Sequence, residues 1–308
     1  MDAAPILRRD LVSLILAAIC WGLGTVVSKA ALSEVPPVSL LAVQLASSVA
    51  VLALLMRAHG VPLRGDTPAL LARLGILNPG LAYALGLLGL MTITASMSVL
   101  LWALEPVMIL VLAGIVLRER LTPGILVLSG AAIGGILLLV YDPASIGGQA
   151  VGIGLALAGI GCCAAYTVMT RRTIPDARET SQVVLAQQAY GLLFALLLVG
   201  TFAVLGQPVA PTGLTPLGVA SALASGVLYY AGAYWLYLGA LRRVPASIAA
   251  GSFYLIPIVG VAAGAVVLGE RLSAIQWIGA VVVLAAVLGI LVRSIPTGRP
   301  VVLATREN

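Results

Sequence analysis

Apolar residues form long, nearly uninterrupted runs in this chain, and polar residues gather in the short stretches between them. An α-helix needs about 20 apolar residues to cross a hydrocarbon layer roughly 30 Å thick. Ten such runs lie near 11–30, 37–57, 71–90, 95–117, 123–141, 149–170, 181–204, 216–240, 245–268 and 273–292. The pattern predicts an all-α polytopic membrane protein with ten transmembrane helices and no loop large enough for a soluble domain.

One stretch of the chain recurs 151 residues later without a gap, since residues 83–121 align with 234–272 and 13 of the 39 pairs are identical. Leucine and valine matches are common in so apolar a chain. The matches of other kinds are Tyr83 with Tyr234, Ala95-Ser96 with Ala246-Ser247, Pro106 with Pro257, and Glu119-Arg120-Leu121 with Glu270-Arg271-Leu272. We therefore expect two repeats of five helices, 1–145 and 146–308.

Positive charge indicates how these repeats lie in a membrane. Five is an odd number, so the second repeat must enter the membrane inverted with respect to the first. With the N-terminus in the cytoplasm, the outer loops hold only Lys29 and Arg271 of the 17 lysines and arginines. The other 15 lie inside, namely Arg8, Arg9, Arg57, Arg64, Arg73, Arg118, Arg120, Arg171, Arg172, Arg178, Arg242, Arg243, Arg293, Arg299 and Arg306. This is the positive-inside pattern, so the net charge of +6 indicates cytoplasmic termini and not a nucleic-acid partner.

The sequence offers little for metal, redox or catalytic chemistry. Its three cysteines, Cys20, Cys162 and Cys163, fall inside predicted helices, and its one histidine, His59, falls in a loop. The predicted helices contain neither paired acids nor the HExxH and GxSxG motifs of hydrolases. We expect neither an enzyme nor a cofactor or metal site.

Candidate chemistry lies inside the predicted helices. Glu105 is the one acid deep within a helix, where a charge costs about 2.5–3.5 kcal/mol on insertion scales. Three roles stay open for it: binding a substrate amine, carrying a coupling proton, and capping backbone freed by Pro106. Pro106 and Pro257 lie at symmetric places, where each removes an amide donor and makes either a hinge or a static bend. Asn78-Pro79-Gly80 predicts a further break.

Aromatic, amide and hydroxyl side chains within the helices complete the candidate site. Rings around one cavity would suit a neutral amphipathic solute, and glutamines can both donate and accept hydrogen bonds without charge. The alternatives are core packing for the rings and interhelical contacts for the amides and hydroxyls. With Glu105, the candidate substrate-binding residues are Trp21, Gln44, Tyr83, Trp102, Tyr166, Gln187, Tyr234, Ser247 and Tyr254. For Lys29, at an outer helix end, we expect an amine that snorkels to the membrane surface.

Several motifs resemble the EamA-type branch of the drug/metabolite transporter superfamily. They are Trp21-Gly22, Ser28-Lys29, Leu104-Glu105-Pro106, Gly269-Glu270-Arg271-Leu272 and Gln276-Trp277-Ile278-Gly279. The resemblance spans both repeats and implies ten helices, cytoplasmic termini and export of metabolites, often amino acids. A narrower similarity is to YddG-type exporters of aromatic and other neutral amino acids. Gln44 stands where members often carry an arginine, so a substrate contact through that arginine does not transfer.

The sequence thus predicts a secondary exporter in a bacterial inner membrane. Its substrate would be a small neutral metabolite, with aromatic or neutral amino acids first, moved by alternating access through a central cavity. We expect the first four helices and their partners, the sixth to ninth, to line that cavity. One rival is a multidrug or hydrophobic-cation exporter, in which Glu105 and the aromatic rings serve as counter-charge and cage. A second is a membrane protein that does not transport. The expected partners are a small molecule and the lipid bilayer; oligomeric state, coupling ion and exact substrate stay open.

Overall fold

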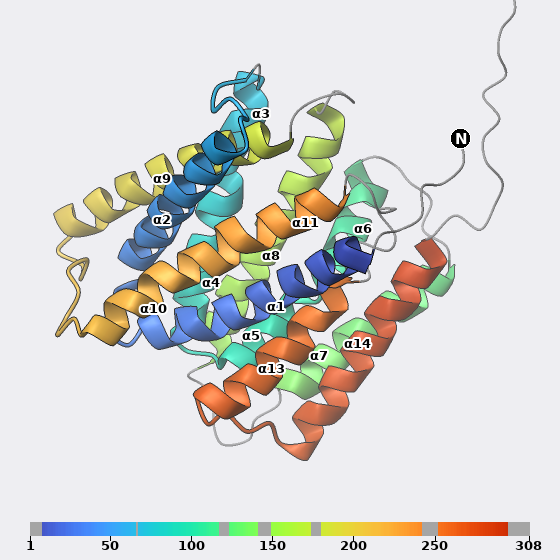
Figure 1. Ribbon diagram of the computed structural model, residues 1–308. Helices are drawn as coiled ribbons and strands as arrows, with labels where there is room; N and C mark the ends of the chain where they lie inside the picture. Colours follow the sequence, from blue (N-terminus) through green and yellow to red (C-terminus); the bar gives the residue numbers. More distant parts are fainter. Residues whose placement is uncertain are drawn as a thin grey trace, which may run out of the picture.

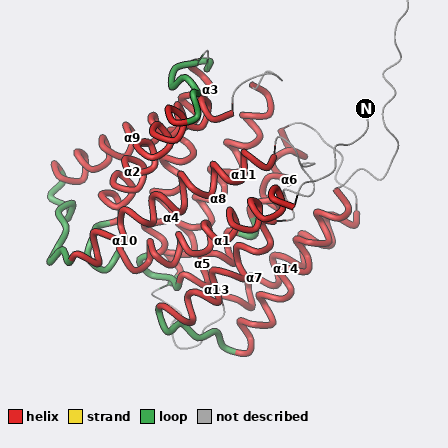
Figure 2. Tube along the Cα trace, viewed as in Figure 1, coloured by secondary structure: helices red, strands yellow, loops and turns green. Residues whose placement is uncertain are grey.

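Every regular element in the described part of the chain is a helix. The computed structural model describes residues 8–65, 67–116, 123–140, 149–173, 180–241 and 252–294 (Figure 2). The first half contains α1 (Arg8–Ala31), α2 (Pro37–Ala58), α3 (Ala69–Arg73), α4 (Ala82–Leu90), α5 (Ala95–Trp102), α6 (Glu105–Val116) and α7 (Pro123–Val140). The second half contains α8 (Ala150–Thr173), α9 (Thr180–Val204), α10 (Pro216–Gly226), α11 (Ala233–Leu241), α13 (Leu255–Val267) and α14 (Ala274–Ser294).

Six of the helical segments are long and apolar enough to cross a membrane. They are Arg9–Ala31, Pro37–Ala58, Ala69–Leu90, Ala150–Thr170, Ser181–Val204 and Pro216–Tyr237. Four shorter apolar helices lie at Ala95–Ile109, Leu126–Leu139, Leu255–Val267 and Ala274–Gly289. The apolar runs of the sequence therefore fall on helices throughout the described residues, while the count of ten complete spans stays a prediction. The expected division between residues 145 and 146 lies outside the described residues.

Helices of the two halves are interrupted at corresponding places. A 3-10 turn (Leu74–Ile76) and a π-helical turn (Leu77–Leu81) separate α3 from α4, and a π-helical segment (Val227–Gly232) separates α10 from α11. Shifted by the 151-residue offset of the repeat, the first π-helical turn falls on the second. Asn78 has a non-helical backbone with φ −143° and ψ 118°, which confirms the break predicted at this position.

Pro106 and Pro257 each lie in the first turn of a new helix. Helix α5 ends at Trp102 and α6 begins at Glu105, directly before Pro106. A 3-10 turn (Ser252–Tyr254) precedes α13, in which Pro257 is the third residue. The backbone N–H groups in the first turn of a helix form no hydrogen bond within that helix. Proline, which has no N–H, therefore fits there without breaking a hydrogen bond. The prolines therefore mark helix starts beside a break, and their hinge role remains a prediction.

Contacts between helices recur when the two halves are exchanged. Helix α1 packs against α10, α11 and α13, and its counterpart α8 packs against α4, α5 and α6. Helix α2 packs on α9, and α7 packs on α14, so these pairs each join a helix to its own counterpart. In Figure 1 the α2–α9 pair lies at one edge of the bundle and the α7–α14 pair at the opposite edge. The repeat seen in the sequence is therefore also a repeat of packing, as an internal two-fold relation requires.

Glycine lets backbones approach closely at two of these crossings. A Cβ atom on Gly75 would overlap the main-chain oxygen of Gln187 in α9. Gly135 of α7 and Gly279 of α14 lie against each other, with the added Cβ of Gly279 at 2.5 Å from the Gly135 oxygen. Small residues serve this purpose in membrane helices, where close van der Waals packing drives association.

Candidate functional site

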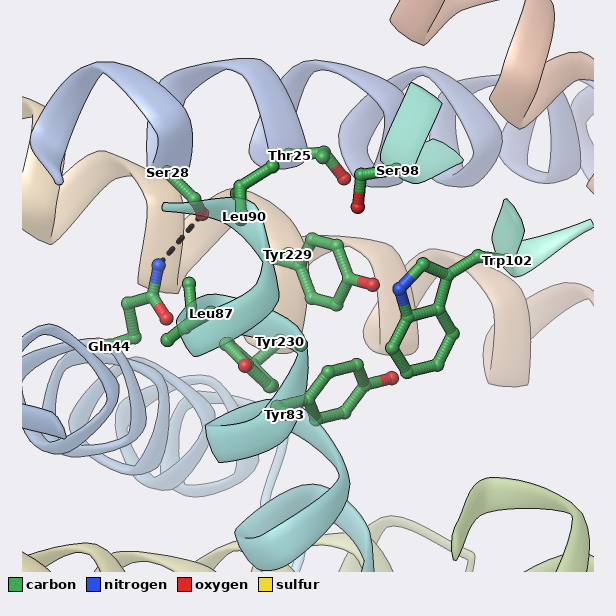
Figure 3. Close-up of a pocket in the computed structure, with 11 residues that line it drawn as sticks. Thr25, Ser28, Gln44, Tyr83, Leu87, Leu90, Ser98, Trp102, Tyr229 and Tyr230 are labelled. Carbon is green, nitrogen blue, oxygen red and sulfur yellow. Dashed lines mark hydrogen bonds between the residues drawn. The ribbon is translucent and has the colours of Figure 1, made fainter. Parts of the chain in front are cut away.

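A cavity of about 30 Å³ lies between α1, α2, α4, α5 and the π-helical segment of the second half (Figure 3). Its lining residues are Thr25, Ser28, Gln44, Tyr83, Gly86, Leu87, Leu90, Ser98, Trp102, Tyr229 and Tyr230, and none carries a formal charge. Since one water needs roughly 10–15 Å³ on this measure, the cavity holds about two waters. It must widen before a larger solute enters.

Aromatic rings make up much of the cavity wall. Tyr83 stacks on Trp102 with ring centroids 5.3 Å apart and 18° between the planes. Tyr229 and Tyr230 meet Tyr83 edge to face, at 5.3 and 5.2 Å. Both arrangements are favoured by the ring quadrupole. In Figure 3 the hydroxyl groups of Tyr83 and Tyr229 are directed toward Trp102, so polar tips gather at this side of an otherwise apolar wall.

Gln44 forms a polar part of the wall, on the far side from Trp102 in Figure 3. Its side chain is 1% exposed. The amide nitrogen Nε2 donates to the hydroxyl oxygens of Ser28 and Ser225, both at 2.8 Å. The amide oxygen Oε1 has no hydrogen-bond partner among the described residues. Gln44 thus joins α1, α2 and α10 through its nitrogen only.

A second aromatic group adjoins the cavity without lining it. Trp21 lies at the centre, with ring centroids 5.5 Å from Tyr234, 5.7 Å from Tyr237 and 5.3 Å from Phe253. Trp21 is 7% exposed and packs with the alanines Ala17 and Ala233. Trp21 and Tyr234 were candidate substrate contacts. The structure shows that both pack against other side chains outside the cavity lining.

Tyr166 and Gln187 are brought together away from the cavity lining. The Tyr166 hydroxyl donates to Gln187 Oε1 at 2.7 Å, and Gln187 Nε2 donates to the Leu71 carbonyl at 3.0 Å. The next residue, Gln188, donates to the Tyr230 carbonyl at 3.3 Å. Both carbonyls lie at or beside interrupted helices, where neighbouring side chains must satisfy backbone groups in a membrane. These contacts correspond to the interhelical alternative for the glutamines.

Glu105 is not among the described residues that line the cavity. It begins α6 and lies within electrostatic range of Tyr229 on the cavity wall, as well as of Cys163 and Tyr166. A carboxylate in the first turn of a helix also interacts favourably with the helix dipole. The position is compatible with each of the three roles that the sequence leaves open.

Two of the candidate residues cannot be placed in this site. Ser247 lies outside the described residues. Tyr254 ends a 3-10 turn, and its side chain lies outside the described part of the structure.

Of the candidates named from the sequence, Gln44, Tyr83 and Trp102 line the cavity together. Sequence reasoning missed the hydroxyls of Thr25 and Ser98 and the pair Tyr229-Tyr230. A tyrosine pair in the middle of a predicted helix was the available signal for the last two, in a chain with only 5% aromatic residues. Among the described residues, the second half lines this cavity through its π-helical segment, and the expectation that the sixth, seventh and ninth helices also line a central cavity stays a prediction.

Charged side chains hold the turn between α4 and α5. Lys29, in the last turn of α1, donates to the carbonyl oxygens of Leu90 at 2.6 Å and Ile93 at 2.9 Å. The Glu270 carboxylate, from the α13–α14 loop, accepts from the backbone N–H groups of Ala95 at 2.7 Å and Ser96 at 2.8 Å. A cation at the end of α4 and an anion at the start of α5 both suit the helix dipoles. We name these four contacts the clamp.

The clamp corrects the expectation that Lys29 snorkels to the membrane surface. Its amine is turned to the protein because the end of α4 presents carbonyl oxygens that no helical donor satisfies. The clamp also joins the two halves, since Glu270 lies in the second half and its partners lie in the first.

Further contacts between the halves lie around the turn that follows α1. The Glu34 carboxylate accepts from the backbone N–H and the hydroxyl of Thr215, both at 2.8 Å. Thr215 is itself the N-cap of α10 and accepts from the Gly218 N–H. The Ser39 hydroxyl donates to the Val209 carbonyl at 2.6 Å. The start of α10 is therefore attached to the α1–α2 turn.

Comparison with known proteins agrees with this two-part layout. One solved structure, described only as a crystal structure of a protein, is similar with a TM-score of 0.61 and 18% identity, over 91% of this chain and 95% of that one. An identity so low supports the fold alone. No curated protein matches the sequence. The model of the EamA-like transporter family matches twice, at residues 9–141 and 150–292. The chain is therefore a multi-pass membrane protein that belongs to the EamA-like transporter family, a family of small-solute transporters.

Proposed function

We propose that the protein exports small neutral metabolites across a bacterial inner membrane, with aromatic and other neutral amino acids as first candidates. The observation that carries this proposal is the uncharged cavity, which has stacked rings at one side and a buried amide at the other. An amphipathic solute needs apolar surface for its side chain and a few placed polar groups for its head. Both are available within one cavity.

Alternating access is the mechanism that this layout supports. If the N-terminus is cytoplasmic, the clamp and the Glu34–Thr215 contact lie on the outer side, and this conformation is closed there. Export then requires the clamp to open after the solute has entered from the cytoplasm. Repeats of inverted topology support such a cycle, because a state closed on one side implies a related state closed on the other.

A hydrophobic cation is the competing substrate class. The faces of Tyr83, Trp102 and Tyr229 are suited to cation–π contact. Glu105, which interacts electrostatically with Tyr229, would be the counter-charge. The described lining residues carry no charge and therefore favour a solute without net charge, because a net charge would lose its hydration without meeting an opposite charge at the wall.

Counterflow in proteoliposomes tests the proposal. Vesicles loaded with unlabelled phenylalanine should take up labelled phenylalanine when they contain the protein, and other neutral amino acids should compete. Trp102→Ala should raise the half-saturating concentration about two- to thirteenfold, because a stacked contact between the Trp102 ring and an aromatic solute is worth about 0.5–1.5 kcal/mol. Trp277→Ala on α14 is the matched control, since Trp277 is 52% exposed and does not line the cavity.

The other outcomes of this assay would favour one of the alternative functions. Exchange inhibited by tetraphenylphosphonium and not by amino acids would establish a cation exporter. Absence of flux for every amino acid and cation, with correctly folded protein in the vesicles, would establish a protein that does not transport.

A further inference from the structure

The cavity wall holds a buried hydrogen-bond acceptor that lacks a donor. Gln44 is 1% exposed, and its Oε1 atom has no partner among the described residues. No other residue that lines the cavity has a buried, unpartnered side-chain atom in this part of the chain. A buried acceptor without a donor destabilises its surroundings. A solute donor that reached this oxygen in place of cavity water would form a favourable hydrogen bond.

Two serines determine which end of the amide faces them. The Ser28 hydroxyl donates its proton to the Gly24 carbonyl at 2.7 Å, and the Ser225 hydroxyl donates to the Ala222 carbonyl at 2.9 Å. Each oxygen can then only accept a further hydrogen bond, so Gln44 must present its N–H groups to both. Rotating the amide by 180° would set its oxygen against two acceptors. The orientation therefore follows from the network, and Figure 3 shows the oxygen turned away from Ser28.

The opposite side of the cavity presents donors. The Trp102 indole nitrogen can only donate a hydrogen bond, and it lies across the cavity from Gln44 in Figure 3. The lining thus has a fixed acceptor at one side and an obligate donor at the other, with rings between them and no formal charge. This polarity matches a zwitterion, whose ammonium group donates and whose carboxylate accepts.

Resting on the proposed function, we infer that Gln44 Oε1 accepts a hydrogen bond from the ammonium group of a zwitterionic solute with an apolar side chain. Gln44 then selects solutes that have an N–H group to donate, and a positive charge without an N–H group does not meet this requirement. Ser225 is a positioning residue, because it does not line the cavity and acts only by holding the amide of Gln44.

Counterflow of labelled phenylalanine, with unlabelled competitors, separates a hydrogen bond from a charge. N,N,N-trimethylphenylalanine keeps the positive charge of phenylalanine and has no N–H. With the native protein it should compete at least tenfold more weakly, since a hydrogen bond to a charged group is worth about 1.5–3 kcal/mol. In Gln44→Leu, unlabelled phenylalanine should compete more weakly by a similar factor. The difference between phenylalanine and its trimethyl derivative should then disappear.

Ser225→Ala tests the positioning role. Losing one of its two anchors lets the amide of Gln44 rotate, so the half-saturating concentration should rise several-fold while the maximal rate is retained. Ser225→Ala should add nothing in the Gln44→Leu background. Thr201→Ala in α9 is the control, because the Thr201 hydroxyl bonds only to its own helix at Leu197.

The outcomes keep this inference separate from the proposed function. Absence of amino-acid exchange by the native protein would overturn the proposed function. Normal exchange in which the trimethyl compound competes as well as phenylalanine would overturn only the role of Gln44. Equal competition by the trimethyl compound needs no variant, so it would overturn the role of Gln44 even if Gln44→Leu does not fold.

Discussion

At the scale of single residues, Glu105 is the group whose roles differ most in their consequences. It stands at the start of α6, within electrostatic range of the cavity wall at Tyr229. As a proton carrier it would alternate between charged and neutral forms during the cycle. As a cap it would stay ionised beside the N-terminus of α6, where the helix dipole favours negative charge. Transport driven by a pH gradient distinguishes these roles.

If Glu105 carries the coupling proton, Glu105→Gln should abolish phenylalanine transport driven by an imposed pH gradient and leave counterflow intact. Glutamine keeps the shape of the side chain but has no proton to release. The measurement is labelled uptake with and without the gradient. Asp66→Asn, at an acid that lies between α2 and α3 in the sequence, is the control that should keep gradient-driven transport. Unchanged gradient-driven uptake in Glu105→Gln would exclude proton carriage. A joint loss of counterflow and thermal stability would indicate a cap.

At the scale of elements, the ends of interrupted helices hold much of the polar chemistry of this protein. Membrane helices satisfy their own backbone groups except at their ends, and no water is present in the hydrocarbon to help. Lys29 and Glu270 supply the missing partners at the α4–α5 turn. Gln187 and Gln188 do the same at the other interrupted helices. Glu270 and Gln187 also join the two halves. The contacts of Glu270 should therefore oppose opening at the clamp.

Glu270→Gln should shift the conformational equilibrium toward the state open at the clamp, roughly tenfold. Glutamine can still accept from Ala95 but loses the charge that makes these bonds about twice as strong, and about 1.4 kcal/mol corresponds to a factor of ten. The probe is Ser98→Cys, on the cavity wall, labelled from outside by an impermeant maleimide in a background without the three native cysteines.

Arg271→Gln is the matched control, since it removes a neighbouring exposed charge and none of the clamp contacts. An unchanged labelling rate in Glu270→Gln, with counterflow intact, would contradict a gating role for the clamp.

At the scale of the whole molecule, the composition of the outer surface indicates which solvent surrounds the protein. Large apolar side chains face outward, among them Val127 at 72% exposed, Val204 at 88% and Val266 at 85%. Such an apolar surface is unfavourable in contact with water and favourable in contact with the hydrocarbon of a bilayer. The polar contacts are instead enclosed or placed at helix ends. Orientation across the bilayer is then set by the positive charges of the loops.

We expect Thr212→Cys to react with an impermeant reagent from outside intact cells, and His59→Cys to react only after the membrane is opened. Both residues are exposed and lie in loops that the proposed threading places on opposite sides. The measurement is labelling of intact and permeabilised cells in the background without native cysteines. The reverse pattern would show that the protein has the opposite orientation. Labelling of both residues from outside would contradict the number of spans predicted between them.

Much of the fold could be predicted from the sequence, because apolar runs and a gapless repeat are properties of the chain itself. Where the structure describes them, the predicted runs fall on helices, and the break at Asn78 is where the pattern places it. The site was predicted less completely. Tyr83 and Trp102 were expected to face a cavity and do, whereas Tyr229 and Tyr230 were not expected and line it too. Helices apolar on all sides have no amphipathic stripe, so their sequence does not indicate which face meets which neighbour.

The sequence by itself determined the solvent, the helices and the duplication of this protein, since hydrophobic length and repeat spacing can be read without knowing which helices are neighbours. Its motifs and the match to the family model indicated the family. Only the tertiary structure decided which polar groups meet. The amide of Gln44 is oriented by Ser225, which is 181 residues away in the chain. The Glu270 carboxylate finds its partner Ala95 across 175 residues. Such contacts depend on how helices pack, and the packing surface of an all-apolar helix is fixed only when its neighbours are in place.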